Sequence, residues 1–224
     1  MGPQVGTGDD VVKDSLGHEE SSPDFVDETI LKSWEHGDNI LSDTELEQKR
    51  LEAAQYKIEG NALYTDSKTR EACDKYTAGL RVCPLKFTQD RAVLYANRGQ
   101  MKRVMGLSDL AIKNCSKAIE LNPSYLKALL RRAEIYEETE KLDEALKDYQ
   151  SVLELDPKNV VAHKAVRELP AMIKERNEKL KAEMMDNLKK LGNMCLKPFG
   201  LSTNNFKMEQ NESGSYNIQF QQNP

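Results

Sequence analysis

The sequence predicts an all-α protein, built as a right-handed superhelix of three helical repeats followed by a long capping helix. A disordered acidic N-terminus and a possible small C-terminal β-hairpin complete the prediction. Two observations carry it. A phrase that ends in proline recurs three times, as AGLRVCP, KAIELNP and SVLELDP. Aromatic residues are only 6% of the chain and the mean hydropathy is −0.69, so a thin, extended architecture fits better than one thick core.

The first segment, residues 1–41, is predicted to be an acidic disordered leader. Residues 1–50 hold 13 Asp and Glu against 4 Lys and Arg, whereas the remainder carries 24 against 28. Such a composition buries too little apolar surface to offset the entropy of ordering the chain. A solubilising tail is the favoured interpretation. The alternative is a docking peptide, a short amphipathic helix formed by Phe25, Val26, Ile30, Leu31 and Trp34.

The three repeats are predicted to occupy residues 42–158. Order begins at Ser42, which with Glu45 forms the Ser-x-x-Glu pattern of a helix-capping box. The recurring prolines are Pro84, Pro123 and Pro157. Counted back from these prolines, the same positions recur with the same sizes: small residues at Gly60, Gly99 and Ala133 and at Ala72, Ala111 and Ala145, and larger residues at Tyr76, Cys115 and Tyr149. We expect the small residues where two helices approach closely.

This phasing is identified as the tetratricopeptide repeat pattern, a helix-turn-helix unit of about 34 residues. Pro157 follows Pro123 at this period, whereas the interval from Pro84 to Pro123 is longer because of extra residues in CPLKFTQD. A longer turn there costs little. The predicted helices are roughly 43–65, 69–82, 88–105, 108–121, 125–138 and 142–155.

Two further segments follow the repeats. Residues 159–191 have apolar periodicity and are predicted to cap the exposed hydrophobic edge of the third repeat, with a kink or short break at Pro170. Residues 192–224 form a C-terminal extension. Within it, NFKMEQ and SYNIQF alternate in hydropathy around NESG, which suggests a β-hairpin or an extended tail packed on the cap.

Five polar residues on the first helices of the repeats form the candidate site: Lys57, Asn61, Asn97, Lys127 and Arg131. The first helices of such repeats line the concave groove. Lys57 and Asn61 are four residues apart, as are Lys127 and Arg131, so each pair shares one helix side. Taken singly, each has an ordinary explanation as a solvated surface residue. Taken together, they are five donors and no acid, and their common target would be a carboxylate.

These five positions resemble the dicarboxylate clamp of co-chaperones with tetratricopeptide domains. That family holds the acidic C-terminal tails of heat-shock protein 90 and heat-shock protein 70, which end in Glu-Glu-Val-Asp. The resemblance implies that Lys57, Asn61 and Asn97 hold mainly the main-chain carboxylate, and that Lys127 and Arg131 hold the acidic side chain. Gln100 and Arg103 depart from the groove residues usual in the family, which leaves the preference between the two tails open.

Other classes of function are less well supported. No P-loop, dinucleotide fingerprint or nucleophile motif is present and only His163 lies in the folded part, so an enzyme is not expected, nor any cofactor or metal. A signalling adaptor that binds a folded partner, such as a GTPase-pathway protein, with the clamp secondary, is the remaining alternative. No basic stripe suggests nucleic acid. Four cysteines without metal spacing and no long apolar run predict a cytoplasmic protein, with no membrane insertion, and we expect a monomer.

Overall fold

The computed structural model describes residues 41–210 and 216–221. It divides into two compact units, Met1–His163 and Lys164–Pro224. The predicted acidic leader, apart from Leu41, lies outside the described residues. The first unit holds three helical hairpins, whose helices are α2 (Asp43–Thr65), α3 (Thr69–Val82), α4 (Thr88–Val104), α5 (Ser108–Leu121), α6 (Leu126–Glu138) and α7 (Leu142–Leu155). These bounds agree with the predicted helices to within one residue at each end.

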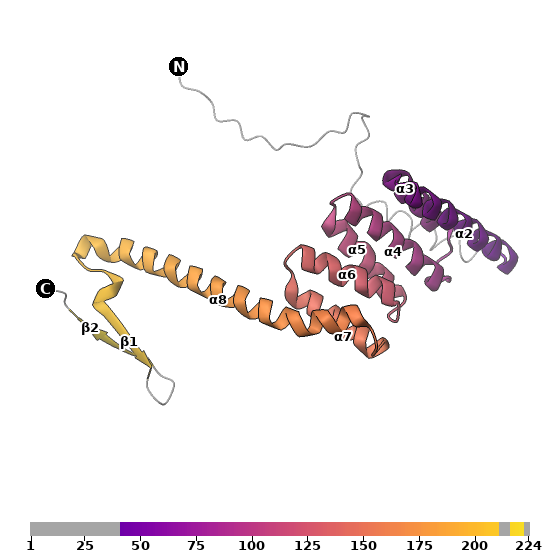
Figure 1. Cartoon of the computed structure of the whole chain (residues 1–224). Coiled ribbons are helices and arrows are strands. Elements are labelled where there is room, and N and C mark those ends of the chain that lie inside the picture. Colours follow the sequence, from indigo (N-terminus) through magenta and orange to yellow (C-terminus); the bar gives the residue numbers. More distant parts are fainter. Residues whose placement is uncertain (1–40, 211–215, 222–224) are drawn as a thin grey trace, which may run out of the picture. The chain divides into compact units, whose positions relative to one another are not determined.

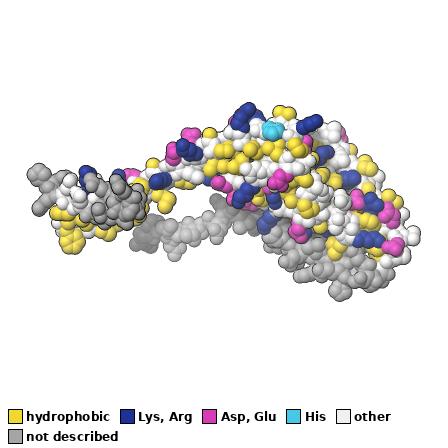
Figure 2. All heavy atoms as spheres, turned by 90° about the horizontal axis from the view of Figure 1, so that it is seen from below, with side chains coloured by type: hydrophobic (Ala, Val, Ile, Leu, Met, Phe, Trp, Pro, Cys, Tyr) yellow, Lys and Arg dark blue, Asp and Glu magenta, His cyan; other side chains and the backbone are white. Residues whose placement is uncertain are grey.

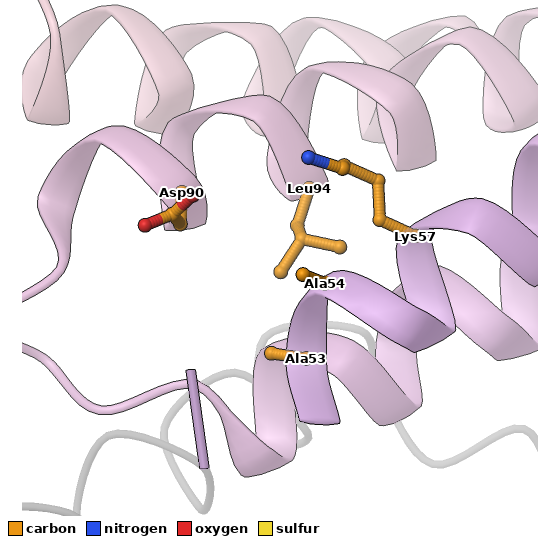
Figure 3. A pocket seen from close by; sticks show the side chains of 5 residues that line it. All are labelled: Ala53, Ala54, Lys57, Asp90 and Leu94. Carbon is orange, nitrogen blue, oxygen red and sulfur yellow. The ribbon is translucent and has the colours of Figure 1, made fainter. Parts of the chain in front are cut away.

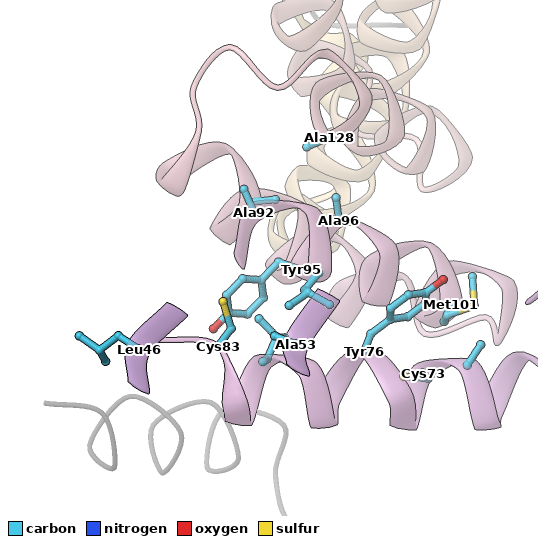
Figure 4. Packing of buried hydrophobic residues seen from close by; sticks show 14 residues of the cluster. Leu46, Ala53, Cys73, Tyr76, Cys83, Ala92, Tyr95, Ala96, Met101 and Ala128 are labelled. Carbon is cyan, nitrogen blue, oxygen red and sulfur yellow. The ribbon is translucent and has the colours of Figure 1, made fainter. Parts of the chain in front are cut away.

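Consecutive helices of the first unit pack against one another, and α4 also contacts both α2 and α6 (Figure 1). The predicted capping box opens α2: Glu45 N donates to Ser42 Oγ at 3.3 Å, and Ser42 N donates to Glu45 Oε2 at 2.7 Å. The core is thin and rich in alanine, with Ala53, Tyr76, Cys83 and Tyr95 all at most 1% exposed (Figure 4). A thin core of this kind is what the composition predicts.

Small residues lie where the helices of a hairpin approach closely, as the repeat pattern predicts. A Cβ atom on Gly60 would lie 2.7 Å from Cε1 of Tyr76, and one on Gly99 would lie 3.0 Å from Sγ of Cys115. Both contacts are shorter than packed carbon side chains tolerate. The two larger residues come from the second helix of the same repeat, so this pair of positions fixes the distance between the two helices.

The turn inside each hairpin has one backbone conformation. Ser67, Gly106 and Glu140 all have positive φ, at 62°, 77° and 57°. The three occupy the same position relative to the proline of their repeat, and in each turn the next residue donates its N–H to a carbonyl five positions back, as Lys68 does to Leu63 at 2.9 Å. This pattern satisfies carbonyls that the helix end leaves unpaired. Only one of the three positions carries glycine, so the sequence did not reveal the feature.

The long connection between α3 and α4 is held by a buried arginine. Arg91 is 1% exposed, and its Nη1 donates to the carbonyl oxygens of Leu80 at 3.0 Å and Cys83 at 2.5 Å. These carbonyls belong to the C-terminal end of α3, where the helix has no further N–H groups to pair with them. The guanidinium therefore caps the C-terminal end of α3 and fixes the start of the longer turn in CPLKFTQD.

A polar pair also links the two helices of every hairpin. Arg132 donates to both carboxylate oxygens of Asp148 at 2.7 Å, and at the same repeat positions Arg98 donates to Asn114 Oδ1 at 2.6 Å. In the first repeat the charges are exchanged, because Glu59 pairs with Lys75 at 2.7 Å. The three links therefore share one geometry but differ in chemistry.

The helix α8 (Val160–Leu196) begins after Asn159, whose Oδ1 accepts from Ala162 N at 3.1 Å. It continues without interruption through Pro170, so the predicted short break is wrong. A proline removes a single helical hydrogen bond, and the turns on either side keep theirs. The helix also passes through Gly192, where it was expected to end. That glycine allows close approach instead, because a Cβ there would lie 2.7 Å from Cγ2 of Thr203.

The second unit ends in the β-hairpin that the sequence suggested. Two short 3₁₀ turns, Lys197–Phe199 and Thr203–Asn205, lead into β1 (Phe206–Gln210), which pairs antiparallel with β2 (Tyr216–Phe220). Thr203 N donates to Asn193 Oδ1 at 2.6 Å, so the segment before the hairpin is bound to the end of α8. No helix among the described residues is long and apolar enough to cross a membrane.

Candidate functional site

The five predicted site residues lie on three neighbouring helices. Lys57 and Asn61 are on α2, Asn97 is on α4, and Lys127 and Arg131 are on α6. Because α4 contacts both α2 and α6, the three helices form a continuous surface, here called the α2–α4–α6 face. The first helix of each repeat therefore contributes at least one of the predicted residues to this face.

Three of the five residues are joined directly by hydrogen bonds. Asn97 Nδ2 donates to Asn61 Oδ1 at 3.3 Å, and Arg131 Nη1 donates to Asn97 Oδ1 at 3.1 Å. These residues are 36 and 34 positions apart in the chain. The repeats therefore bring Asn61, Asn97 and Arg131 into one row, although each belongs to a different hairpin.

Tyr76 extends this row from the second helix of the first repeat. Its hydroxyl donates to Asn61 Oδ1 at 2.8 Å, and its side chain is 1% exposed. Burial raises the pKa of Tyr76, and the charge of Arg131 lowers it in part. The repeat pattern alone predicts only a helix-packing role for Tyr76. The signal for its second role is that a tyrosine, and not a phenylalanine, occupies this packing position.

The two hydrogen bonds that reach Asn61 Oδ1 set the orientation of its amide. An asparagine side chain has one acceptor oxygen and two N–H donors. With the oxygen accepting from Tyr76 and Asn97, the N–H groups of Asn61 remain for other acceptors. Asn97 likewise accepts from Arg131 and keeps an N–H, and Arg131 keeps further guanidinium donors. The row therefore presents donors on the α2–α4–α6 face.

Lys57 lies one helical turn before Asn61 and lines a shallow pocket with Ala53, Ala54, Asp90 and Leu94 (Figure 3). Its amino group extends toward α4. Asp90 is already engaged, because Arg50 Nε donates to its Oδ2 at 2.7 Å. Across the part of the chain that the structure describes, Lys57 forms no ion pair.

Lys127 is exposed one turn before Arg131 on α6. It too forms no ion pair with any described residue. The two lysines are therefore cations on the α2–α4–α6 face that keep their charge available to an outside ligand. Their hydrogen-bond geometry with a ligand is not fixed by neighbouring side chains, in contrast to the row of Asn61, Asn97 and Arg131.

Arg103, one of the two departures from the family pattern, is engaged between α4 and α6. Its Nε donates to both carboxylate oxygens of Glu138 at 3.0 and 3.1 Å, and its Nη1 donates to Glu134. The hydrogen bonds that Arg103 donates to Glu138 and Glu134 raise the pKa of Arg103. Its charge is thus balanced within the protein, and the face gains no further cation there. The sequence pattern does not predict this pairing, because the partners belong to different repeats.

The arrangement suits a carboxylate more than catalysis or metal binding. Arginine, lysine and amide N–H groups all donate to carboxylate oxygens, and donors that carry charge form the stronger hydrogen bonds. Among the described residues, no group of three or more His, Cys, Asp or Glu side chains is placed to hold a metal ion. The ring of His163 contacts the carbonyl oxygen of Pro157 at 2.8 Å, outside the face.

Known proteins similar to the chain share its repeats. Residues 92–125 and 126–159 match family models described as tetratricopeptide repeat. Sperm-associated antigen 1A of Danio rerio is 35% identical over 127 residues, which are 55% of this chain and 30% of that protein. DnaJ homolog subfamily C member 7 of Homo sapiens is 35% identical over 100 residues, 45% of this chain and 20% of that protein. The chain thus spans less than a third of the length of these relatives.

Solved structures give the same result at the level of the domain. The first TPR of Spaghetti (RPAP3) bound to HSP90 peptide SRMEEVD is 34% identical with a TM-score of 0.50, over 54% of this chain and 92% of that one. The first TPR domain of human RPAP3 is 32% identical with a TM-score of 0.51, over 56% of this chain and 95% of that one. The similarity therefore covers nearly the whole of those domains and about half of this chain.

Proposed function

The chain is a tetratricopeptide repeat protein, and we propose that its α2–α4–α6 face binds the acidic C-terminal tail of heat-shock protein 90, heat-shock protein 70 or both. It would act as a non-catalytic co-chaperone or adaptor. The observation that carries the proposal is the hydrogen-bonded row of Asn61, Asn97 and Arg131, since it brings donors from three repeats together on one face. A relative with the same repeats is bound to a peptide that ends in Glu-Glu-Val-Asp, which supports the same ligand here.

We assign the role of each group as the resemblance to the dicarboxylate clamp implies. A terminal aspartate carries two carboxylates, one on the main chain and one on the side chain. Asn61, Asn97 and Lys57 hold the main-chain carboxylate, and Lys127 and Arg131 hold the side chain and nearby peptide groups. Arginine suits a two-pronged grip on a carboxylate, and lysine acts as a point charge.

Micromolar affinity is the expected strength. Each charge-assisted hydrogen bond contributes about 1.5–3 kcal/mol net, and ordering a flexible peptide removes part of that gain. A dissociation constant of about 1 μM corresponds to roughly −8 kcal/mol. Residues 51–224 carry 28 Lys and Arg against 24 Asp and Glu, which favours encounter with acidic tails, and this contribution falls as salt increases.

Isothermal titration calorimetry of the full chain tests the proposal. The titrants are peptides with the tail sequences of both chaperones, each with a free and an amidated C-terminus. We expect micromolar binding of the free peptides and loss of most of it on amidation, because amidation removes the main-chain carboxylate. Equal binding of free and amidated peptides would contradict the proposal. The two free peptides together measure the preference between the chaperones.

Within the family, we place the chain near tetratricopeptide repeat protein 1, as a cytoplasmic protein. The stretch RNEKLKAEMMDNLKKLGNMCLKPFGLS and the ending GSYNIQFQQNP are similar to that protein. The alternative function is a signalling adaptor. If the peptides fail to bind while a folded signalling protein does, the adaptor function takes the place of the clamp.

A further inference from the structure

Arg131 lies beside an acidic residue with which it does not pair. Residues three or four positions apart are neighbours on a helix surface, and among those positions on α6 only Glu134 is acidic. A glutamate and an arginine at such spacing attract each other. Within the described part of the chain, however, Arg131 forms no ion pair, and its Nη1 donates to Asn97 instead.

A cation that ignores an adjacent acid is unusual on this surface. Figure 2 shows Lys and Arg side chains close to Asp and Glu side chains over the surface of the molecule. Cations of the first unit pair with acids on their own helix, as Lys117 does with Glu120, three residues further on, at 2.7 Å. Arg131 and Glu134 have the same spacing and form no such pair, so another group must hold one of the two.

Arg103 on α4 holds Glu134. Its Nη1 donates to Glu134, and its Nε donates to both carboxylate oxygens of Glu138. The side chain of Arg103 is 21% exposed, so salt and solvent screen these pairs less than they screen fully exposed ones. Glu137, the third acid at this end of α6, accepts from the hydroxyl of Tyr149. Each of the three acids therefore has a partner other than Arg131.

We propose that Arg103 is a positioning residue for the peptide site: by holding Glu134, it leaves the guanidinium of Arg131 available to the carboxylate of the ligand. Without Arg103, the carboxylate of Glu134 turns to Arg131, and an incoming ligand has to displace it. This inference rests on the proposed function, because it takes Arg131 as a residue that binds an acidic tail. It gives a role to one of the two residues that depart from the family pattern.

The two acids that Arg103 holds separate local competition from an effect of net charge. Glu134 is three residues from Arg131, whereas Glu138 is seven residues away, about 10 Å along the helix at about 1.5 Å per residue. Only Glu134 is therefore a surface neighbour of Arg131. Neutralising either acid changes the net charge by the same amount, but only neutralising Glu134 removes the competitor.

Titration calorimetry of the full chain with a free Glu-Glu-Val-Asp peptide tests the proposal. We expect Arg103→Ala to weaken binding by roughly three- to fivefold, because the ligand must then break an ion pair of Arg131. Adding Glu134→Gln to Arg103→Ala should restore most of the lost affinity. Adding Glu138→Gln to Arg103→Ala should not, because Glu134 still competes for Arg131.

The matched control is Lys117→Ala. It removes one cation from α5, outside the α2–α4–α6 face, and likewise leaves an acid, Glu120, without that partner. It should leave peptide affinity nearly unchanged. The circular dichroism spectra of all variants should match that of the unaltered protein, which verifies their folding. Unchanged affinity in Arg103→Ala, equal recovery in the two double variants, or recovery in neither would overturn the proposal.

A second measurement needs no peptide. The Nε–H group of Arg131 gives a signal in the NMR spectrum of the free chain, which Arg131→Lys identifies. This signal should shift in Arg103→Ala, return when Glu134→Gln is added, and stay shifted when Glu138→Gln is added. A signal that does not move in Arg103→Ala would overturn the proposal. If the unaltered chain binds no peptide, the proposed function fails, and this signal still decides whether Glu134 turns to Arg131.

Discussion

Arg131 on α6 donates from Nη1 to Oδ1 of Asn97 on α4 at 3.1 Å. Through this bond a cation of the third repeat orients an amide of the second, and that amide donates in turn to Asn61 of the first. The three repeats thus share one polar row. A change in one member is expected to disturb donors that belong to the other two.

Replacing Arg131 by alanine should weaken binding of a Glu-Glu-Val-Asp peptide about tenfold or more, because it removes a charged donor worth about 1.5–3 kcal/mol. Oδ1 of Asn97 also loses the donor that orients it. Titration calorimetry measures the effect. Lys147→Ala, which removes one positive charge from the exposed surface of α7, is the matched control and should change affinity less than twofold. Equal losses in both variants would mean that net charge, and not the row, governs binding.

Tyr76→Phe tests whether the hydroxyl behind Asn61 orients the site. This hydrogen bond is made with and without peptide, so its roughly 1 kcal/mol counts toward affinity only as far as it orients Asn61, and peptide affinity should fall by up to about fivefold. Tyr149 occupies the same position in the third repeat, but its hydroxyl donates to Glu137 at 2.5 Å and not to a site residue. Tyr149→Phe should therefore leave affinity unchanged. If the two variants bind the peptide equally well, Tyr76 has only a packing role.

Most of the helical framework was predictable from sequence because the repeat is a local signal. Proline, small residues and helix periodicity recur at fixed offsets, and the helix bounds follow from them. The capping box at Ser42 is equally local. The same phasing selected the five candidate residues, and the structure brings three of them, Asn61, Asn97 and Arg131, into contact.

What the sequence missed depends on contacts between distant residues. The partners of Arg103 are Glu134 and Glu138 on α6, 31 and 35 positions along the chain, and no local pattern in the sequence identifies them. A glycine commonly follows a helix, so Gly192 predicts a helix end, and only the structure shows that this glycine instead allows Thr203 to approach closely. Pro170 reads as a break because local rules do not weigh one lost hydrogen bond against a helix of 37 residues.

Gly60→Ala should destabilise the first repeat. The new Cβ would lie 2.7 Å from Cε1 of Tyr76, and relieving that contact costs about 1–3 kcal/mol, more than the roughly 1 kcal/mol that alanine gains over glycine in a helix. Urea unfolding followed by circular dichroism gives the change in unfolding free energy. Ala133 holds the same position in the third repeat and is 0% exposed. Ala133→Gly should also destabilise, by about 1 kcal/mol through helix propensity and by a further amount through the loss of a buried methyl group. A stabilised Gly60→Ala variant would show that the helices separate without cost.

Ser67→Gly should stabilise the protein by about 0.5–1 kcal/mol. Ser67 has φ of 62°, a conformation that costs a residue with a Cβ about 1–2 kcal/mol, and the greater freedom of glycine in the unfolded chain offsets part of the gain. Gly106 holds the same position in the second repeat, with φ of 77°. Gly106→Ala should lower stability for the same reason. Thermal unfolding of the two variants should therefore shift in opposite directions, and shifts of the same sign would contradict the argument.

Stability should fall in alkali because of Cys115. Burial raises the pKa of this thiol to about 11, although Arg131 and Arg132 lower it in part, whereas an unfolded cysteine titrates near about pH 8.5. Between these values the unfolded chain has lost the proton and the folded chain keeps it, so the unfolding free energy decreases as pH rises. The part of the unfolding free energy that the buried, protonated thiol supplies is fully present below about pH 8.5 and is lost by about pH 11. Urea unfolding across this range should show a shallower decline in Cys115→Ala than in the unaltered protein, because the variant lacks the titrating thiol. Parallel declines would show that Cys115 does not supply the pH dependence.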